Sequence, residues 1–110
     1  MIILDTNALI YATKQRVDLT RFIKEEIVVP SSVLEELDSL SIKYSYARIA
    51  KVLASKFRVV HVDAKGDEGV IEAVRRYGGT VLTNDRNLIN LLKRERISSY
   101  SISRSKVRTL

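Results

Sequence analysis

The sequence predicts an α/β fold in three layers (α/β/α), with helices on both faces of a central, mainly parallel β-sheet. Short apolar runs recur along the chain and are typical of strands that are buried on both faces. Between them lie segments whose apolar residues recur with helical spacing. Strands that alternate with helices form right-handed crossover units, and such units build a parallel sheet.

Each element is predicted from its own local pattern. Strands are expected where apolar and β-branched residues run together, at 2–4, 27–29, 57–62, 80–83 and 99–102. Helices are expected at 6–13, 19–26, 32–40, 46–56, 67–77 and 87–95. Pro30 follows the second strand, and the pair Gly78-Gly79 is a typical end for the helix that precedes it.

Length and composition indicate one globular domain, residues 1–110, in a reducing compartment. The sequence has no cysteine, which excludes disulfides, zinc–thiolate sites and cysteine nucleophiles. The apolar start of the chain contains Asp5 and lacks a basic segment, so it is expected to be neither a signal peptide nor a membrane span. We therefore predict a cytoplasmic protein with no membrane partner.

Four acidic residues are predicted to lie on apolar faces instead of solvated ones. In the helix at 32–40, the spacing of Glu36 from Val33 and Leu40 places it on the buried stripe. Its neighbour Glu35 has polar surroundings and completes an S-x-x-E capping box with Ser32. Glu35 is thus expected to be structural, and Glu36 to be functional.

The other three acids occupy strand ends and helix starts. Asp67 and Asp85 each begin an apolar helical stripe, and Asp5 ends the first strand. Parallel strands end at one edge of their sheet, and ligands bind beside that edge, so the four acids are expected to converge there. The alternative for Asp67 and Asp85 is a helix cap, a role that aspartate often has.

A converged acidic cluster requires cations, because buried like charges repel one another. The predicted cofactors are hard divalent ions that prefer oxygen ligands, Mg²⁺ or Mn²⁺, with one or two ions in the site. The single histidine, His61, lies in a predicted strand and is interpreted as structural.

Four short motifs, in order and across nearly the whole chain, resemble those of the PIN-domain nucleases. They are LDTN at 4–7, VLEEL at 33–37, GDEGVIEA at 66–73 and TND at 83–85. The resemblance implies that the catalytic, metal-binding residues are Asp5, Glu36, Asp67 and Asp85, with Asn7 and Thr83 as auxiliary groups. It agrees with the argument from helical faces, which was made without it.

A narrower resemblance concerns the segments 34–51 and 83–106. They look like the PIN nuclease of the eukaryotic small-subunit processome and its archaeal relatives. This implies an endoribonuclease that hydrolyses phosphodiester bonds in single-stranded RNA or a ribosomal precursor, with a homodimer or a ribosome-assembly protein as a further partner. The alternatives are a toxin-type PIN ribonuclease of a toxin–antitoxin pair and a catalytically silent RNA-binding PIN scaffold.

The chain is basic, with 19 Lys and Arg against 13 Asp and Glu, which is compatible with an RNA substrate. One predicted RNA contact mixes bases with aromatic rings: Lys43, Tyr44, Tyr46 and Arg48. A second is purely basic and covers the last helix and the C-terminal segment: Arg86, Lys93, Arg94, Arg104, Lys106 and Arg108. The structural alternatives are tyrosines that pack a helix edge and a solvated basic tail.

Two other classes of protein with an aspartate after the first strand are disfavoured. A phospho-acceptor receiver domain requires a second acid beside Asp5, where this chain has Thr6. A haloacid-dehalogenase-type phosphatase requires the motif D-x-D, and position 7 is Asn7.

Overall fold

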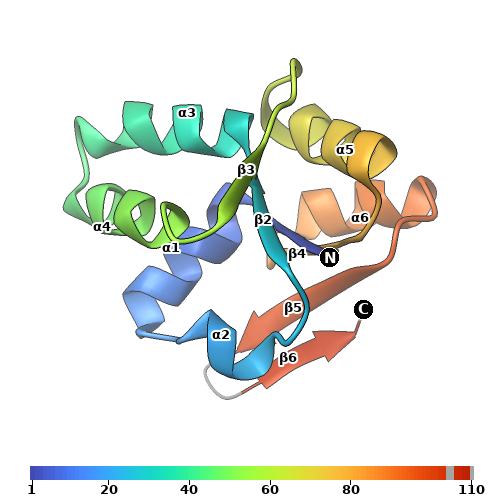
Figure 1. Cartoon of the computed structure of the whole chain (residues 1–110), viewed down its shortest axis with the longest axis horizontal. Helices are drawn as coiled ribbons and strands as arrows, with labels where there is room; N and C mark the ends of the chain where they lie inside the picture. Colours follow the sequence, from blue (N-terminus) through green and yellow to red (C-terminus); the bar gives the residue numbers. More distant parts are fainter. Residues whose placement is uncertain (104–105, 110) are drawn as a thin grey trace.

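The computed structural model describes residues 1–103 and 106–109 and confirms the predicted α/β architecture. Its sheet has six strands in the order β3-β2-β1-β4-β5-β6 (Figure 1). They are β1 (Ile2–Leu4), β2 (Ile27–Pro30), β3 (Arg58–Val60), β4 (Thr80–Leu82), β5 (Ser99–Ser103) and β6 (Lys106–Thr109). Strands β1 to β5 pair in parallel, and β6 pairs antiparallel with β5.

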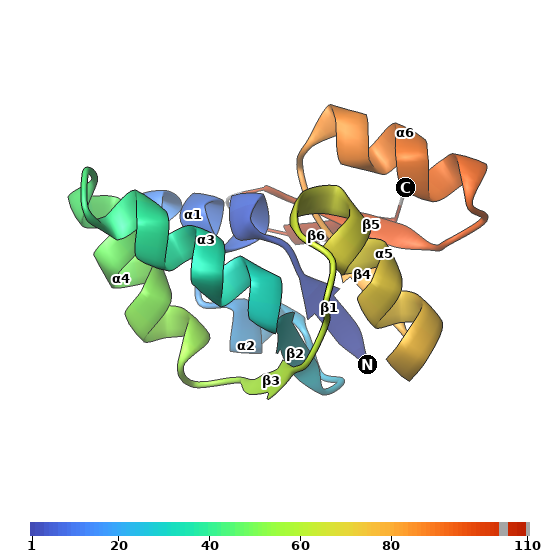
Figure 2. The same ribbon diagram turned by 90° about the horizontal axis from the view of Figure 1, so that it is seen from above.

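The helices cover both faces of this sheet. In order they are α1 (Thr6–Gln15), α2 (Leu19–Phe22), α3 (Ser31–Ser41), α4 (Ser45–Ala54), α5 (Gly66–Tyr77) and α6 (Arg86–Arg94). Helices α1, α3 and α4 lie on one side, and α5 and α6 lie on the other (Figure 2). In the part of the chain that the structure describes, no helix has the length and apolar character needed to cross a bilayer.

The central strand β1 contributes to an apolar cluster on each face of the sheet. Ile2 and Leu4 belong to the cluster that contains α1, α3 and α4 side chains. Ile3 belongs to the cluster formed with α5 and α6. Because side chains alternate along a strand and both faces are covered, β1 is apolar at every position.

Two segments differ from the prediction. The helix expected at 19–26 ends at Phe22, because Ile23 is extended (φ −110°, ψ 116°) and the chain then leads into β2. No strand was expected after 103, where the basic segment was predicted to contact RNA, with a solvated tail as the alternative; residues 106–109 form β6. Val107 pairs with Ile102 of β5 and packs against the apolar cluster around α1. The sequence Lys106-Val107-Arg108 thus has the alternation of polar and apolar residues that is typical of a strand.

The strand order places the carboxyl ends of β1 and β4 side by side. From β1 the chain moves outward through β2 and β3, whereas after β4 it moves in the other direction through β5. Such a reversal is the point at which open α/β sheets bind ligands. Helix α1 begins just after β1, α3 follows β2 directly, and α6 begins shortly after β4, so several helix starts surround this point.

Candidate active site

A cavity of about 250 Å³ lies at the carboxyl ends of the strands. All four acids predicted from the sequence line it: Asp5, Glu36, Asp67 and Asp85. Asn7, the first predicted auxiliary residue, also lines it from the first turn of α1. We call it the acidic cavity below. The acids are supplied by four different parts of the fold, so only the tertiary structure brings them together.

Asp5 is the buried member of this group, with 6% of its surface exposed. Its Oδ1 accepts a hydrogen bond from the Ala8 backbone N–H at 2.8 Å, which makes Asp5 the N-cap of α1. Its Oδ2 accepts one from the Thr83 hydroxyl at 2.6 Å. Burial raises the pKa of Asp5 to about 7, with smaller contributions from the charges of Asp85 and Asp67, although the two hydrogen bonds act in the opposite direction.

Thr83, the second predicted auxiliary residue, does not line the cavity but lies directly beneath its acids. It is fully buried, and its Oγ1 donates to Asp5 and accepts a hydrogen bond from the Asp85 backbone N–H at 2.9 Å. The next residue, Asn84, makes two side-chain hydrogen bonds of 2.8 Å to the backbone of Ile102 in β5. These bonds continue the pairing of β4 with β5 and fix the turn that carries Asp85.

Asp85 is both a helix cap and a member of the cavity. Its Oδ1 accepts hydrogen bonds from the backbone N–H groups of Asn87 and Leu88, which begin α6. Within the described residues, its Oδ2 accepts no hydrogen bond. The capping alternative therefore holds for Asp85, but a cap uses only one of its two oxygens.

Asp67 is not a cap. Helix α5 begins after Lys65, whose side chain makes no capping hydrogen bond, and Asp67 lies within the first turn. It is exposed at the cavity edge, and its pKa is raised by partial burial and then by the charges of Asp85, Glu36 and Glu68. These charge effects indicate that Asp67 is electrostatically close to the other acids.

Glu36 lies one turn into α3, and the prediction that it is buried is wrong. The helix stripe on which it lies faces the acidic cavity, which leaves its carboxylate exposed. Its Oε2 accepts a hydrogen bond of 3.0 Å from the hydroxyl of Thr6, a residue that the sequence analysis did not assign to the site. The position of Thr6 within the LDTN motif was the available signal.

The predicted capping box of Ser32 and Glu35 is also wrong. Helix α3 begins after Pro30 and has no side-chain cap, and the buried Ser32 hydroxyl has no hydrogen-bond partner among the described residues. Ser31 instead binds across to the end of β3: its Oγ donates to the Val62 carbonyl at 3.2 Å and accepts from the Val62 N–H at 3.0 Å. A distant backbone segment thus takes the place of a local cap.

The donors around the acidic cavity suit a hard cation. Its titratable lining groups are all carboxylates, with no histidine or cysteine. Among the residues that the structure describes, no three such groups are already close enough to hold one ion together. Mg²⁺ often binds through one or two carboxylates and keeps several waters, so this donor set fits an ion whose shell is completed by water.

Comparison with known proteins decides the family. A family model described as a PIN-like domain matches residues 2–103. The chain belongs to the PIN-like domain family. The resemblance drawn from the four motifs is thereby confirmed at family level, whereas the narrower likeness to processome nucleases gains no specific support.

Two further matches agree with membership of the PIN-like domain family. Ribonuclease VapC9 of Archaeoglobus fulgidus is 32% identical over 95 residues, which cover 78% of this chain and 70% of that protein. A domain of a functionally unknown protein from Methanocaldococcus jannaschii superposes with a TM-score of 0.69, covering 93% of this chain and 90% of that one. At 14% identity, this second match shows the fold alone.

The first predicted RNA contact, residues 43–48, lies at the turn between α3 and α4 and in the first turn of α4. The rings of Tyr44 and Tyr46 are stacked, with centroids 5.1 Å apart. Lys14, which the sequence analysis did not include, lies over Tyr46 at 4.2 Å, and Lys43 lies 5.9 Å from the Tyr44 centroid. Tyr44 is exposed and Tyr46 half-buried, so the structural alternative accounts for part of Tyr46 but not for Tyr44. Arg48 donates to the Ser41 carbonyl at 3.3 Å.

The second predicted contact is divided between different parts of the PIN-like domain. Arg86 is exposed at the start of α6 beside Asp85, whereas Lys93 and Arg94 are exposed in the last turn of that helix, away from the cavity. Lys106 and Arg108 belong to β6. Arg104 lies outside the described residues. The described residues of this predicted contact therefore belong to two different elements, α6 and β6.

Proposed function

We propose that this protein is a metal-dependent endoribonuclease that hydrolyses phosphodiester bonds in single-stranded RNA. The main support is that four carboxylates from separate elements line one cavity at the point where the strand order reverses. Capping and solvation do not require four acids to meet there. The similarity to ribonuclease VapC9 supports the same activity.

The four acids are the proposed holders of one or two divalent ions, Mg²⁺ or Mn²⁺. Such an ion supplies positive charge that lowers the pKa of a water molecule and stabilises the leaving oxygen. Asp5 is held rigidly by its hydrogen bonds to Ala8 and Thr83, and Asp85 has one oxygen that accepts no hydrogen bond from the residues that the structure describes. Glu36 and Asp67, both exposed at the cavity edge, have the freedom to turn toward an ion and a phosphate.

The tyrosine stack of Tyr44 and Tyr46, with Lys14 and Lys43 beside it, is the proposed contact for bases of a single strand. It adjoins the acidic cavity through Leu40, which lines the cavity and accepts the Tyr44 backbone N–H at 2.8 Å. Exposed aromatic rings bind unpaired bases by stacking, and nearby cations bind the phosphates between them.

Of the biological roles considered, the toxin-type ribonuclease is better supported than ribosomal RNA processing. The support is the 32% identity to ribonuclease VapC9, which has no counterpart for a role in ribosome maturation. A catalytically silent scaffold would differ from these two enzymes in binding RNA without cleaving it.

The decisive experiment is cleavage of a labelled single-stranded RNA by the purified protein. Mn²⁺ or Mg²⁺ is expected to support cleavage, and EDTA to abolish it. Glu36→Gln should lower the rate at least about 100-fold, since it removes a charge from the reacting centre without changing shape. Glu95→Gln is the matched control, because Glu95 is an exposed acid that pairs with Arg75 at the far end of α6.

Each failure has its own meaning. Equal rates for Glu36→Gln and Glu95→Gln would contradict the role of Glu36. Cleavage that persists in EDTA but is lost in Asp5→Asn would contradict the metal requirement. RNA binding without cleavage at any metal concentration would favour the silent scaffold.

A further inference from the structure

A second hollow, of about 400 Å³, adjoins the acidic cavity on the outer side of α3. The two share Ser32, Glu36 and Gly66 in their linings. Gly66 has φ +58°, and a Cβ built there would meet no atom within 4 Å. The two spaces therefore adjoin, and the surface beside Gly66 has room for a ligand. We call the second space the polar hollow.

Apart from Gly66, the residues that line the polar hollow all have polar or charged side chains: Ser32, Ser39, Glu35, Glu36 and Lys65. The Ser32 hydroxyl is buried, so the polar groups open to a ligand are the Ser39 hydroxyl, two carboxylates and the Lys65 ammonium group. No apolar residue type lines it in the described part of the chain, so the groups that can orient a ligand there are polar or charged. Lys65 is the one basic residue that lines either space in the described part of the chain.

The backbone at Lys65 is held firmly on both sides. Its carbonyl accepts the Gly69 N–H at 3.3 Å as α5 begins. On the preceding side, the backbone N–H groups of Asp63 and Ala64 both donate to the Glu72 carboxylate, at distances of 2.9 to 3.1 Å. The point from which the Lys65 side chain extends is thus fixed relative to α5.

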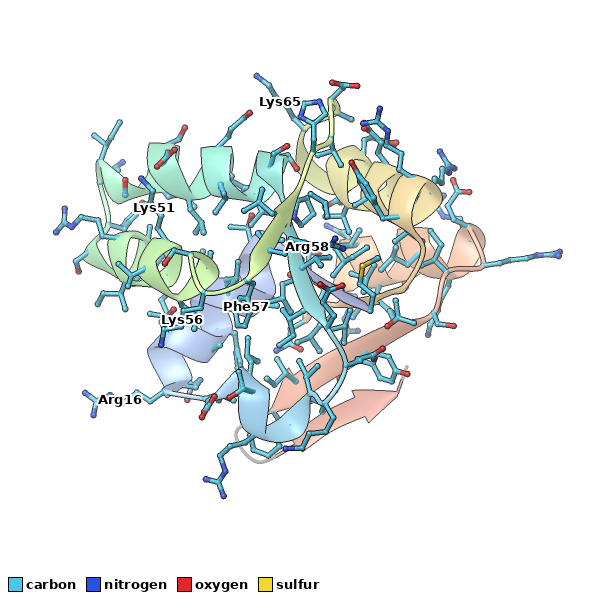
Figure 3. The ribbon with its side chains drawn as sticks, in the orientation of Figure 1. Arg16, Lys51, Lys56, Phe57, Arg58 and Lys65 are labelled. Carbon is cyan, nitrogen blue, oxygen red and sulfur yellow. The ribbon has the colours of Figure 1, made fainter. Side chains whose placement is uncertain are left out.

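The Lys65 side chain itself has no partner among the described residues, although two glutamates line the same hollow. Other cations near this side of the molecule are paired: Lys51 with Asp38, and Arg76 with Glu72. Figure 3 shows Lys65 on the loop between β3 and α5, beside the start of α3 and well apart from Lys51, Lys56 and Arg58. An exposed, unpaired ammonium group on a fixed backbone is available to an anionic ligand.

We infer that the polar hollow binds the RNA nucleotide next to the cleaved phosphate, and that Lys65 is a positioning residue that contacts the phosphate of that nucleotide. The inference rests on the proposed ribonuclease function. Four acids around the cleavage site repel the RNA backbone, and a cation beside the site reduces that repulsion. The hydroxyl and carboxylate groups of Ser39 and Glu35 offer hydrogen bonds to a ribose, which suits a nucleotide better than a free inorganic anion.

Lys65→Gln, Lys65→Arg and a control, Lys56→Gln, test the inference. Lys56 is also exposed but lines neither space. Binding of a labelled single-stranded RNA is measured in EDTA over a range of salt concentrations, and cleavage is measured separately in Mn²⁺. Lys65→Gln should weaken binding several-fold and reduce the salt slope by about 0.7, the contribution of one phosphate contact on a single strand.

Lys65→Arg should keep the slope, because it keeps the charge, and Lys56→Gln should change it little. In the cleavage assay, Lys65→Gln should raise KM with kcat within about twofold of wild type, since the lost contact is made before and during the reaction alike. The stabilisation of the protein by Mn²⁺ in melting experiments should be the same as in wild type, because Lys65 is not a metal ligand.

The inference is overturned if wild type cleaves RNA but Lys65→Gln and Lys56→Gln give the same slope and KM. It is also overturned if the loss in Lys65→Gln appears in kcat or in the response to Mn²⁺. If wild type neither binds nor cleaves RNA, the proposed function fails and this inference with it, so the two failures are distinct.

Discussion

The hydroxyl of Thr83 donates a 2.6 Å hydrogen bond to the carboxylate of Asp5, across two neighbouring strands and with both groups buried. The same hydroxyl accepts the backbone N–H of Asp85. One threonine therefore links the two acids that follow β1 and β4, and it does so at the centre of the candidate site. Burial and the hydrogen bond from Thr83 determine how strongly Asp5 holds a proton.

Asp5→Asn should stabilise the protein at neutral pH. The pKa of Asp5 is raised from 3.8 to about 7, so the folded state binds a proton more tightly than the unfolded state. Wild type should therefore lose stability as pH rises from about 4 to about 7, and the variant should not lose this contribution. The raised pKa corresponds to about 4 kcal/mol at pH 7.5, and the single amide oxygen of Asn loses one of the two hydrogen bonds that the carboxylate accepts, at a cost of about 1–3 kcal/mol. A net gain of about 2 kcal/mol is expected, measured by urea unfolding at several pH values.

Asp67→Asn is the matched comparison and should gain less, because Asp67 is exposed and solvent screens its charge. Both variants should lose cleavage and respond less to Mn²⁺. A lower stability of Asp5→Asn than wild type at pH 7.5 would contradict the raised pKa.

Thr83→Val should destabilise the protein and raise the pKa of Asp5 further. It removes the hydroxyl that donates to Asp5 and leaves the Asp85 N–H without its acceptor. The expected cost is about 1–3 kcal/mol at neutral pH. Thr83→Ser keeps the hydroxyl and should leave the pH dependence of stability at its wild-type position. If Val and Ser shift that dependence equally, the hydroxyl does not control Asp5.

Gly69→Ala should cost about 2 kcal/mol by overpacking the contact between α3 and α5. A Cβ at position 69 would lie 2.5 Å from Ser32 Oγ and 2.6 Å from the Ala64 carbonyl oxygen. Ser32→Ala alone should be neutral or stabilising, because the buried Ser32 hydroxyl has no hydrogen-bond partner in the described part of the chain. The double variant Ser32→Ala/Gly69→Ala should recover only part of the stability lost in Gly69→Ala, because the new Cβ still clashes with the Ala64 carbonyl oxygen. Thermal melting measures all three, and a neutral Gly69→Ala would contradict this packing.

Glu72→Gln should lower the melting temperature at neutral pH. Its carboxylate accepts the backbone N–H groups of Asp63 and Ala64, and these bonds hold the pKa of Glu72 below its ordinary value of 4.5. That stabilisation is present above the unfolded pKa and is lost as pH falls through the folded one. The difference in melting temperature between Glu72→Gln and wild type should therefore become smaller as the pH is lowered.

Glu35→Gln is the control for this comparison, because Glu35 is exposed and has no hydrogen bond in the described structure. It should change the melting temperature little at any pH. A loss in Glu35→Gln as large as that in Glu72→Gln would show that the hydrogen bonds to the 63–64 backbone are not what stabilises this loop.

The order of strands and helices could be predicted from the sequence because it follows from local periodicity. The apolar runs of β1 and β2 and the stripes of α3 and α5 appear within a few neighbouring residues. Element ends were less predictable. The early end of α2 and the pairing of β6 with β5 depend on where the chain must go next and on a distant strand.

Helical spacing identified the acids of the cavity but gave the wrong burial for one of them. A helix stripe that faces a cavity has the same sequence pattern as one that faces the core, so Glu36 was expected to be buried and is exposed. The failure of the Ser32 and Glu35 cap has a similar origin. Ser31 bonds to Val62, a residue 31 positions away, and no local pattern contains that partner.

The sequence by itself determined the chemical character of the site: oxygen donors only, at strand ends and helix starts, in a chain of the PIN-like domain family. Only the tertiary structure decided that Asp5 is buried and linked to Thr83, and that Glu36 is open to solvent. It also decided that Lys65 lines the polar hollow with no partner among the described residues. The reason is physical. Residue type and local spacing are properties of neighbouring residues, whereas burial, charge repulsion and access depend on which distant segments are packed together.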